Sequence, residues 1–205
     1  MILNTILRKI PDTEDIMELF VNMYHENMMT YDPTTNQKVL EIQNCNFYAN
    51  SPYIINHTKV EYDTNWYVEN YDVRLLSYDY NNQYKKNIDR LAKDPYTRRA
   101  FLYMGSPDES NEKFPICTIG MQMILTGEKR DKMNWIVNMR SNSVTKYTTD
   151  WNWQNKWWSR AIEDLSNQTN RVITKGVMFW NANSMHIYEE DFNILEETYQ
   201  QGKWK

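Results

Sequence analysis

Cys117 is the residue of this sequence best suited to covalent chemistry. It lies in the apolar run FPICTIGMQM, where a lone cysteine is more often an inert core thiol than a nucleophile. A thiol attacks as the thiolate, so it needs nearby cations that favour the charged form. Arg98 and Arg99 precede one strand-like run and Arg140 follows another, although each taken singly is typical of a solvated surface. Converging on one cleft, they would activate the thiol and clamp a phosphate, because guanidinium groups match phosphate oxygens.

Three more residues are candidates for ligand binding. His186 and Tyr188 stand two apart in a strand-like run, so their side chains point to the same face. Structural hydrogen bonding is the simpler alternative for this pair. Asp150 precedes a tryptophan-rich stretch, where it either contacts a ligand or only caps a helix.

The composition indicates a globular protein, expected to form one domain over residues 1–205. The chain is 41% hydrophobic and 14% aromatic, with a net charge of −4 that argues against nucleic acid as a partner but leaves room for a small anion. Cys45 and Cys117 lack metal-ligand or redox spacing, so we expect free thiols, a reducing compartment and no metal. With no signal-like N-terminus and no membrane-spanning run, a cytoplasmic protein is expected.

Helical and strand-like patterns are mixed along the chain without regular βαβ alternation. This order favours an α+β fold, with one large mixed β-sheet and helices packed on it. The expected helices cover about 14–28, 58–70, 81–93, a segment from 150 and another from about 190, and the expected strands cover 38–48, 100–104, 116–125, 134–139 and 176–188.

Several segments, in this order, resemble the thymidylate synthase / deoxycytidylate (dCMP) hydroxymethylase family. The likeness extends over about 41–192, and the upstream pair EIQNCNF and EYDTNWYVE resembles the phage-type branch. The order and spacing of the R-R, C, R-S and H-x-Y elements make it specific. The matching segments downstream are NQYKKNIDRLAKDPYTRRAFLYM, FPICTIGMQM, NMRSNSV and WNANSMHIYEEDF.

The resemblance implies a thymidylate synthase-like fold, with a sheet face that forms a homodimer interface. Cys117 matches the family's nucleophile, and Arg140 and Ser141 match phosphate ligands from the same subunit. Arg98 and Arg99 match arginines that reach into the neighbouring subunit's site. Two shared active sites per dimer follow from this match.

The remaining roles implied by the resemblance concern the sugar, the base and proton transfer. His186 and Tyr188 match the pair that binds the sugar 3′-hydroxyl. Asp150 falls at, or one residue from, the position that contacts the pyrimidine edge. Asp63 aligns with the family's general acid/base glutamate and is therefore the second catalytic candidate.

The implied reaction begins with addition of the Cys117 thiolate to C6 of a pyrimidine nucleoside monophosphate. The implied cofactor, 5,10-methylenetetrahydrofolate, provides the carbon that C5 acquires, and water or hydride then gives a hydroxymethyl or methyl product. In the family, Asp at the position of Asp150 accompanies cytosine and Asn accompanies uracil. We therefore expect hydroxymethylation of dCMP, with methylation of dUMP as the alternative; the sequence does not distinguish deoxyribose from ribose.

Departures from the family pattern leave a second hypothesis open. Asp63 is one methylene shorter than glutamate, and Ser143 replaces an aspartate. The segment after the W-Y helix is short, with Tyr78 and Tyr80 as stand-ins for a Tyr-Gly motif. A degenerate member that binds a nucleotide or a partner without turnover would show such changes. The retained thiol and arginines favour the enzyme.

A third hypothesis concerns residues 151–160, WNWQNKWWSR. Tryptophans beside arginine can stack on nucleic-acid bases. This hypothesis requires Trp151 and Trp158 to be exposed.

Overall fold

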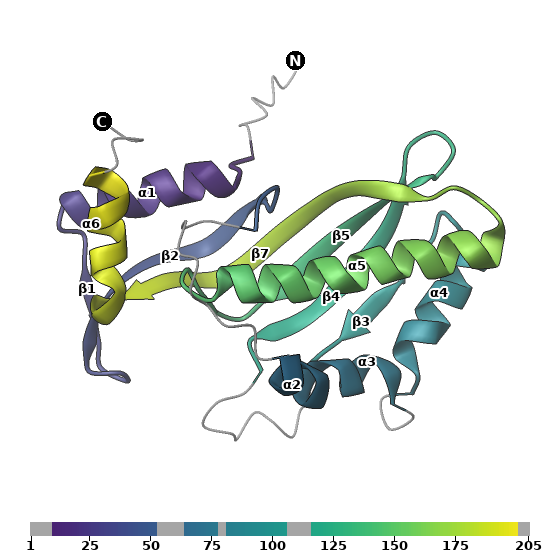
Figure 1. Cartoon of the computed structure of the whole chain (residues 1–205), viewed down its shortest axis with the longest axis horizontal. Helices are drawn as coiled ribbons and strands as arrows, with labels where there is room; N and C mark the ends of the chain where they lie inside the picture. Colours follow the sequence, from purple (N-terminus) through teal and green to yellow (C-terminus); the bar gives the residue numbers. More distant parts are fainter. Residues whose placement is uncertain (1–9, 53–63, 78–80, 106–115, 201–205) are drawn as a thin grey trace, which may run out of the picture.

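The computed structural model describes residues 10–52, 64–77, 81–105 and 116–200, and a single mixed sheet organises these residues (Figure 1). Its strands are β1 (Thr30–Asp32), β2 (Gln37–Tyr48), β3 (Phe101–Tyr103), β4 (Thr118–Thr126), β5 (Lys132–Met139), β6 (Asn142–Ser143) and β7 (Thr174–Tyr188). The strand order is β1-β2-β7-β5-β4-β3, and β6 pairs with β7. Both β5 and β6 run parallel to β7, whereas the other pairs are antiparallel. The predicted α+β class with a mixed sheet is confirmed.

The helices lie at both ends of the sheet and across one of its faces (Figure 1). They are α1 (Thr13–His25), α2 (Thr64–Tyr67), the π-helix η1 (Val68–Asp72), α3 (Val73–Leu76), α4 (Gln83–Lys93), α5 (Tyr147–Thr169), the 3-10 helix η3 (Glu189–Asp191) and α6 (Phe192–Gln200). Helices α1 and α6 pack together at the β1–β2 end, and α4 packs against α5 at the other.

Helix α5 supplies the largest part of the core. Trp153, Trp157, Ala161 and Leu165 recur every four residues and are buried, so they form one apolar stripe that faces the molecule. The connection from β5 to β7 passes through α5, which is the kind of crossover that parallel strands require. This crossover places the first turn of α5 beside the ends of β5 and β6.

The boundaries of the helices differ from the sequence predictions in two informative places. Helix α1 begins at Thr13 because Asp12 and Asp15 form a reciprocal capping box. Helix α5 begins at Tyr147 rather than at Asp150, since the chain already turns into helix after Lys146. Asp150 therefore lies inside the first turn and is not the N-cap.

The tryptophan-rich segment belongs to the core. Trp158 is only 5% exposed, and its indole N–H donates to the Met133 carbonyl at 3.0 Å. Trp151 is half-buried and donates to the Ala49 carbonyl at 3.0 Å. The nucleic-acid hypothesis, which required both rings to be exposed, is wrong.

Helix α5 covers one face of the central strands, and the other face is more exposed. Alternate residues of β5 are buried beneath α5, while residues of the opposite parity, such as Ile136, remain partly exposed. On strands β3, β4 and β7, exposed apolar side chains include Tyr103, Ile119 and Val177. Among the described residues, no helix is long and apolar enough to cross a membrane.

Candidate active site

The thiol and the first arginine lie together at one end of an antiparallel strand pair. Cys117 directly precedes β4 and Arg140 directly follows β5, so the antiparallel pairing of these strands brings the two residues side by side. The Arg140 N–H donates to the Cys117 carbonyl at 2.7 Å. Its guanidinium Nη2 lies 3.7 Å from the Cys117 Sγ. A cation therefore contacts the thiol directly.

The surroundings of Cys117 favour its neutral thiol over the thiolate. Burial raises the pKa of Cys117 and is the largest influence, while Arg140 and Lys146 lower it and Asp150 raises it. The two cations do not fully offset burial, so within this chain the thiol stays protonated at neutral pH. Additional positive charge, or a ligand that alters the site, is needed to favour the thiolate.

Asp150 is held from two sides within the first turn of α5. The Tyr67 hydroxyl donates to Oδ1 at 2.6 Å, and the Asn142 amide donates to Oδ2 at 2.7 Å. Burial raises the pKa of Asp150 to about 6, although both hydrogen bonds and the Lys146 charge lower it. The carboxyl group therefore titrates close to neutral pH. It also lies near enough to Cys117 to raise the pKa of the thiol.

His186 and Tyr188 lie on one face of β7. Their ring centroids are 4.9 Å apart in an edge-to-face arrangement. The hydroxyls of Ser141 and Ser184 each lie 3.4 Å from His186 Nδ1. Ser141 follows Arg140 directly, so this pair connects the histidine to the thiol end of the sheet.

A pocket of about 320 Å³ opens beside His186. Besides the hydroxyls it is lined by two carboxylates, Asp32 from β1 and Glu41 from β2. Burial lowers the pKa of His186 more than these acids raise it, so the imidazole is neutral at neutral pH. The pKa of Asp32 is lowered by hydrogen bonds from Thr34 and Thr35, so it stays ionised. Carboxylates and neutral hydrogen-bonding groups suit sugar hydroxyls better than a phosphate.

This chain is similar in sequence to phage proteins and in fold to a bacterial protein of known structure. The chain is 24% identical, over an alignment of 208 positions, to the deoxycytidylate 5-hydroxymethyltransferases of Enterobacteria phages T4, T2 and T6, covering 82% of this chain and 83% of each relative. Among solved structures, the thermostable thymidylate synthase A from Bacillus subtilis matches with a TM-score of 0.62 at 14% identity, over 92% of this chain and 84% of that chain. No family model matches the sequence.

These likenesses in sequence and in fold support the predicted resemblance to the thymidylate synthase / dCMP hydroxymethylase family. The thymidylate synthase fold explains why residues so far apart in the sequence meet here. Cys117, Arg140 and Ser141 lie at the ends of β4 and β5, while Asp150 and His186 are brought to them by α5 and β7.

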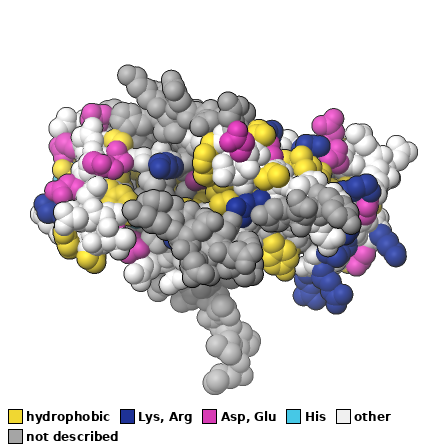
Figure 2. All heavy atoms as spheres, turned by 90° about the horizontal axis from the view of Figure 1, so that it is seen from below, with side chains coloured by type: hydrophobic (Ala, Val, Ile, Leu, Met, Phe, Trp, Pro, Cys, Tyr) yellow, Lys and Arg dark blue, Asp and Glu magenta, His cyan; other side chains and the backbone are white. Residues whose placement is uncertain are grey.

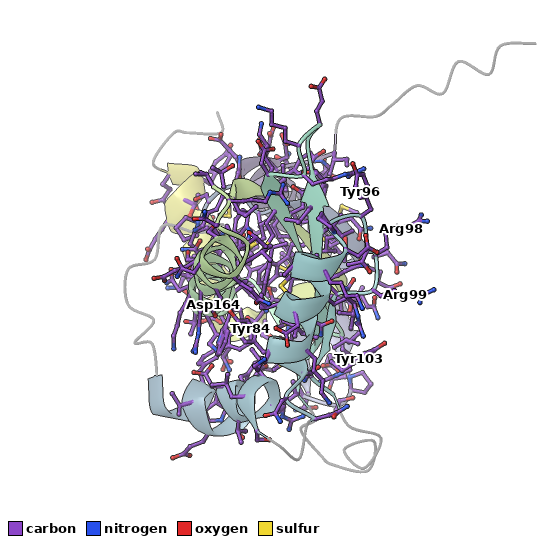
Figure 3. All side chains as sticks on the ribbon, turned by 90° about the vertical axis from the view of Figure 1, so that its right-hand side faces the viewer. Tyr84, Tyr96, Arg98, Arg99, Tyr103 and Asp164 are labelled. Carbon is purple, nitrogen blue, oxygen red and sulfur yellow. The ribbon has the colours of Figure 1, made fainter. Side chains whose placement is uncertain are left out.

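Two family arginines do not join this cluster within the chain. Arg98 and Arg99 lie between α4 and β3, and their side chains are exposed. Figure 3 shows both pointing away from the sheet, on the side opposite Asp164 of α5. Their backbone carbonyls accept hydrogen bonds from Gln122 and Arg90, which fixes the loop that carries them. The guanidinium groups are thus presented outward.

Asp63, the acid/base candidate, lies outside the described residues, as do Tyr78 and Tyr80. The structure instead adds two residues to the site, Tyr67 and Asn142, as the donors to Asp150. Tyr67 lies in the segment EYDTNWYVE and Asn142 lies in the segment NMRSNSV, both of which resemble the family. The sequence held no sign that these side chains meet the same carboxylate. Among the described residues, no group of three or more His, Cys, Asp or Glu side chains could hold a metal ion.

Proposed function

We propose that this protein transfers a one-carbon unit to C5 of dCMP, giving the 5-hydroxymethyl nucleotide through a covalent bond between Cys117 Sγ and C6. The observation that carries this proposal is the juxtaposition of an arginine-contacted thiol with the partly buried carboxyl group of Asp150. Related phage proteins named deoxycytidylate 5-hydroxymethyltransferases support it.

The phosphate and the sugar are assigned to adjacent subsites, with Ser141 at the boundary between them. Arg140 and Ser141 are proposed to bind the 5′-phosphate, since a guanidinium and a hydroxyl donate to phosphate oxygens. The pocket beside His186 is proposed to bind the sugar hydroxyl, because its acids would repel a phosphate. This orientation places the base toward Cys117 and Asp150.

Asp150 is proposed to select the base. A charged carboxylate accepts the cytosine N4–H, whereas uracil presents an oxygen at the same place. Accepting hydrogen bonds from the protonated ring would also stabilise positive charge as the thiolate adds to C6. In that step the S–C6 bond forms and electron density moves to C5, which can then form a bond to the one-carbon unit. As the C5 proton is lost, the bond between the one-carbon unit and its carrier, tetrahydrofolate, would break and the carrier would leave. Water would then add to this carbon, and breaking of the S–C6 bond would release the 5-hydroxymethyl nucleotide and the Cys117 thiolate.

The exposed ring of Trp66, next to Tyr67, is proposed to contact the folate. Trp66 is 44% exposed, and its ring packs against Tyr67 and Tyr71 with centroids 5.1 and 5.2 Å away. Figure 2 shows hydrophobic side chains exposed on the face of the molecule that is seen from below. In α3, Val73 and Leu76 are 42% and 44% exposed. A flat pterin ring would stack on such a surface. When bound, 5,10-methylenetetrahydrofolate would supply a one-carbon unit at the oxidation level of formaldehyde.

We further propose that a homodimer completes the site. Arg98 and Arg99 point outward from the side of the sheet that α5 does not cover (Figure 3), and exposed apolar residues such as Ile119 lie on the neighbouring strand β4. A second copy packed on this side would receive both arginines. Their charge would favour the thiolate that burial disfavours within one chain.

Since the relatives are phage proteins, the cytoplasm of a bacterial host is the proposed location.

The test is release of tritium from C5 of dCMP and of dUMP by the purified protein, with and without 5,10-methylenetetrahydrofolate. Folate-dependent release from dCMP is expected. Product analysis by mass then separates a hydroxymethyl from a methyl group.

Two alternatives have a specific observation behind them. Methylation of dUMP is favoured by the pKa of about 6 for Asp150, because its protonated form can donate to uracil O4. Release of tritium from dUMP alone would establish this alternative. A degenerate, nucleotide-binding member is favoured by the raised pKa of Cys117. Nucleotide binding without release from either substrate would establish that one.

A further inference from the structure

The carboxyl group of Asp150 has one internal donor on each oxygen. Tyr67 of α2 donates to Oδ1 at 2.6 Å, and Asn142 of β6 donates to Oδ2 at 2.7 Å. An ionised carboxylate has about four acceptor positions. Counting donors from the described residues alone, these two bonds fix the plane of the group and leave about one acceptor position on each oxygen for a ligand.

We propose that Tyr67 is a specificity-determining positioning residue, whose hydroxyl holds Asp150 as an ionised, oriented carboxylate and thereby sets the preference for cytosine over uracil. This inference rests on the proposed function of Asp150 as the residue that contacts the base. Asn142 assists from the opposite oxygen. A hydroxyl that donates to the charged form stabilises that form, and only the charged form accepts from cytosine N4–H.

Tyr67 is held rigidly enough for this role. It is buried, and its ring packs against Tyr71 and Trp153 with centroids 5.1 and 6.0 Å away. One π-helical turn later, Asp72 accepts indole N–H bonds from Trp153 and Trp157, both at 2.8 Å. The segment from Tyr67 to Asp72 is therefore attached to α5 at two points. Asp150 and Trp153 lie about one turn apart on that helix, so the Asp72 bonds hold the segment that carries Tyr67 close to the carboxylate.

The charged and titratable groups around Asp150 come from several elements. Lys146, before α5, favours the ionised carboxyl group. Cys117, before β4, and Tyr71, on η1, are near enough for Asp150 to raise their pKa values. Both are neutral at neutral pH, since burial raises the pKa of each. Lys146 and the two hydrogen-bond donors thus oppose the effect of burial on Asp150, and removing the Tyr67 hydroxyl must raise the pKa of Asp150.

The variant Tyr67→Phe removes this hydroxyl and keeps the ring in the core. A hydrogen bond to a charged group is worth about ten- to a hundred-fold in an equilibrium, so the affinity ratio of dCMP to dUMP should fall by about that factor. Calorimetry gives both dissociation constants without any need for turnover. A ¹³C titration of the Asp150 carboxyl carbon should show its pKa above the wild-type value.

The matched control is Tyr84→Phe. Tyr84 donates to Asp164 at the same distance, 2.6 Å, and Asp164 lies on the same helix, α5 (Figure 3). The two carboxylates are about 21 Å apart along the helix axis. Tyr84→Phe therefore removes an equivalent bond far from the site, and the dCMP-to-dUMP ratio should not change. In an Asp150→Asn background no carboxylate remains to be kept ionised, so Tyr67→Phe should change the ratio much less than it does in the wild type.

The outcomes separate this inference from the proposed function. An unchanged pKa of Asp150 in Tyr67→Phe, or an unchanged affinity ratio, would overturn the role of Tyr67. The same fall in the ratio with Tyr84→Phe would also overturn it, because the effect would then reflect general loosening of α5. Failure of the wild-type protein to release tritium would overturn the proposed reaction, while a raised pKa and a lowered ratio in Tyr67→Phe would still support the positioning role.

Discussion

Replacing Asp150 with asparagine should make the protein more stable at neutral pH while it weakens the preference for cytosine. Asparagine keeps the Tyr67 bond through its own carbonyl oxygen. In the wild type, Asn142 Oδ1 is buried and has no donor among the described residues. When the Asn142 side-chain amide rotates by half a turn, this oxygen faces residue 150 and can accept a hydrogen bond from the new asparagine amide. The variant thus retains both bonds and removes a charge from a partly buried position.

The size of the effect follows from the pKa of Asp150. Burial raises this pKa from its ordinary 3.8 to about 6, so the folded protein binds more protons than the unfolded chain between these values. Stability therefore falls as pH rises through this window, and the loss is complete above about pH 6. The difference corresponds to about 3 kcal/mol, an upper limit because the side chain keeps some contact with solvent. Asp150→Asn should recover up to that amount at neutral pH.

The assay is urea unfolding of the wild type and Asp150→Asn at neutral pH and again below pH 3.8. The variant should be the more stable protein at neutral pH, and its advantage should disappear at the acidic pH. The ratio of dCMP to dUMP turnover should fall in the same variant. A variant that is less stable at neutral pH, or whose advantage does not depend on pH, would refute this reasoning about the buried carboxyl group.

Three further predictions test neighbouring features. Arg140→Met should raise the pKa of Cys117 further and slow alkylation of this thiol by iodoacetamide severalfold at neutral pH; an unchanged rate would mean that Arg140 does not influence the thiol. Asp72→Leu should lower the free energy of unfolding by about 3 kcal/mol, because two buried indole N–H groups lose a charged acceptor; urea unfolding measures this, and a loss within error would contradict it. A pyrimidine 3′,5′-bisphosphate should bind at least about tenfold more weakly than the 5′-monophosphate, because Asp32 and Glu41 line the pocket assigned to the sugar. Equal dissociation constants would contradict that assignment.

Much of the fold could be predicted from local patterns. The strand at 38–48 and the helix at 81–93 agree with β2 and α4 to within about two residues, because their apolar periodicity is strong. The short strands β1 and β6 were missed, since each is too short to show a period and owes its conformation to pairing with a neighbour. The start of α5 was misplaced because Asp150 resembles a cap and Lys146 does not.

The candidate site shows the same limit. The types and order of Cys117, Arg140 and Asp150 pointed to a nucleotide site through family resemblance. What the sequence could not give is the balance of effects on each group, since burial depends on the whole fold. The thiol illustrates this, because the adjacent arginine was expected to favour the thiolate, whereas burial outweighs it within the chain. The Tyr67 contact with Asp150 joins residues 83 positions apart, which no local pattern records.

Covalent capture by 5-fluoro-dCMP in the presence of 5,10-methylenetetrahydrofolate tests the central claim most directly. Fluorine cannot leave C5 as a proton does, so the bond from the cysteine to C6 should persist and be detected by mass spectrometry of the digested protein. The expected result is an adduct on the peptide that contains Cys117, absent from Cys117→Ala. Cys45, which is buried with its pKa raised to about 12, serves as the internal control and should stay unmodified. No adduct on Cys117, with the nucleotide bound, would contradict the proposed covalent mechanism.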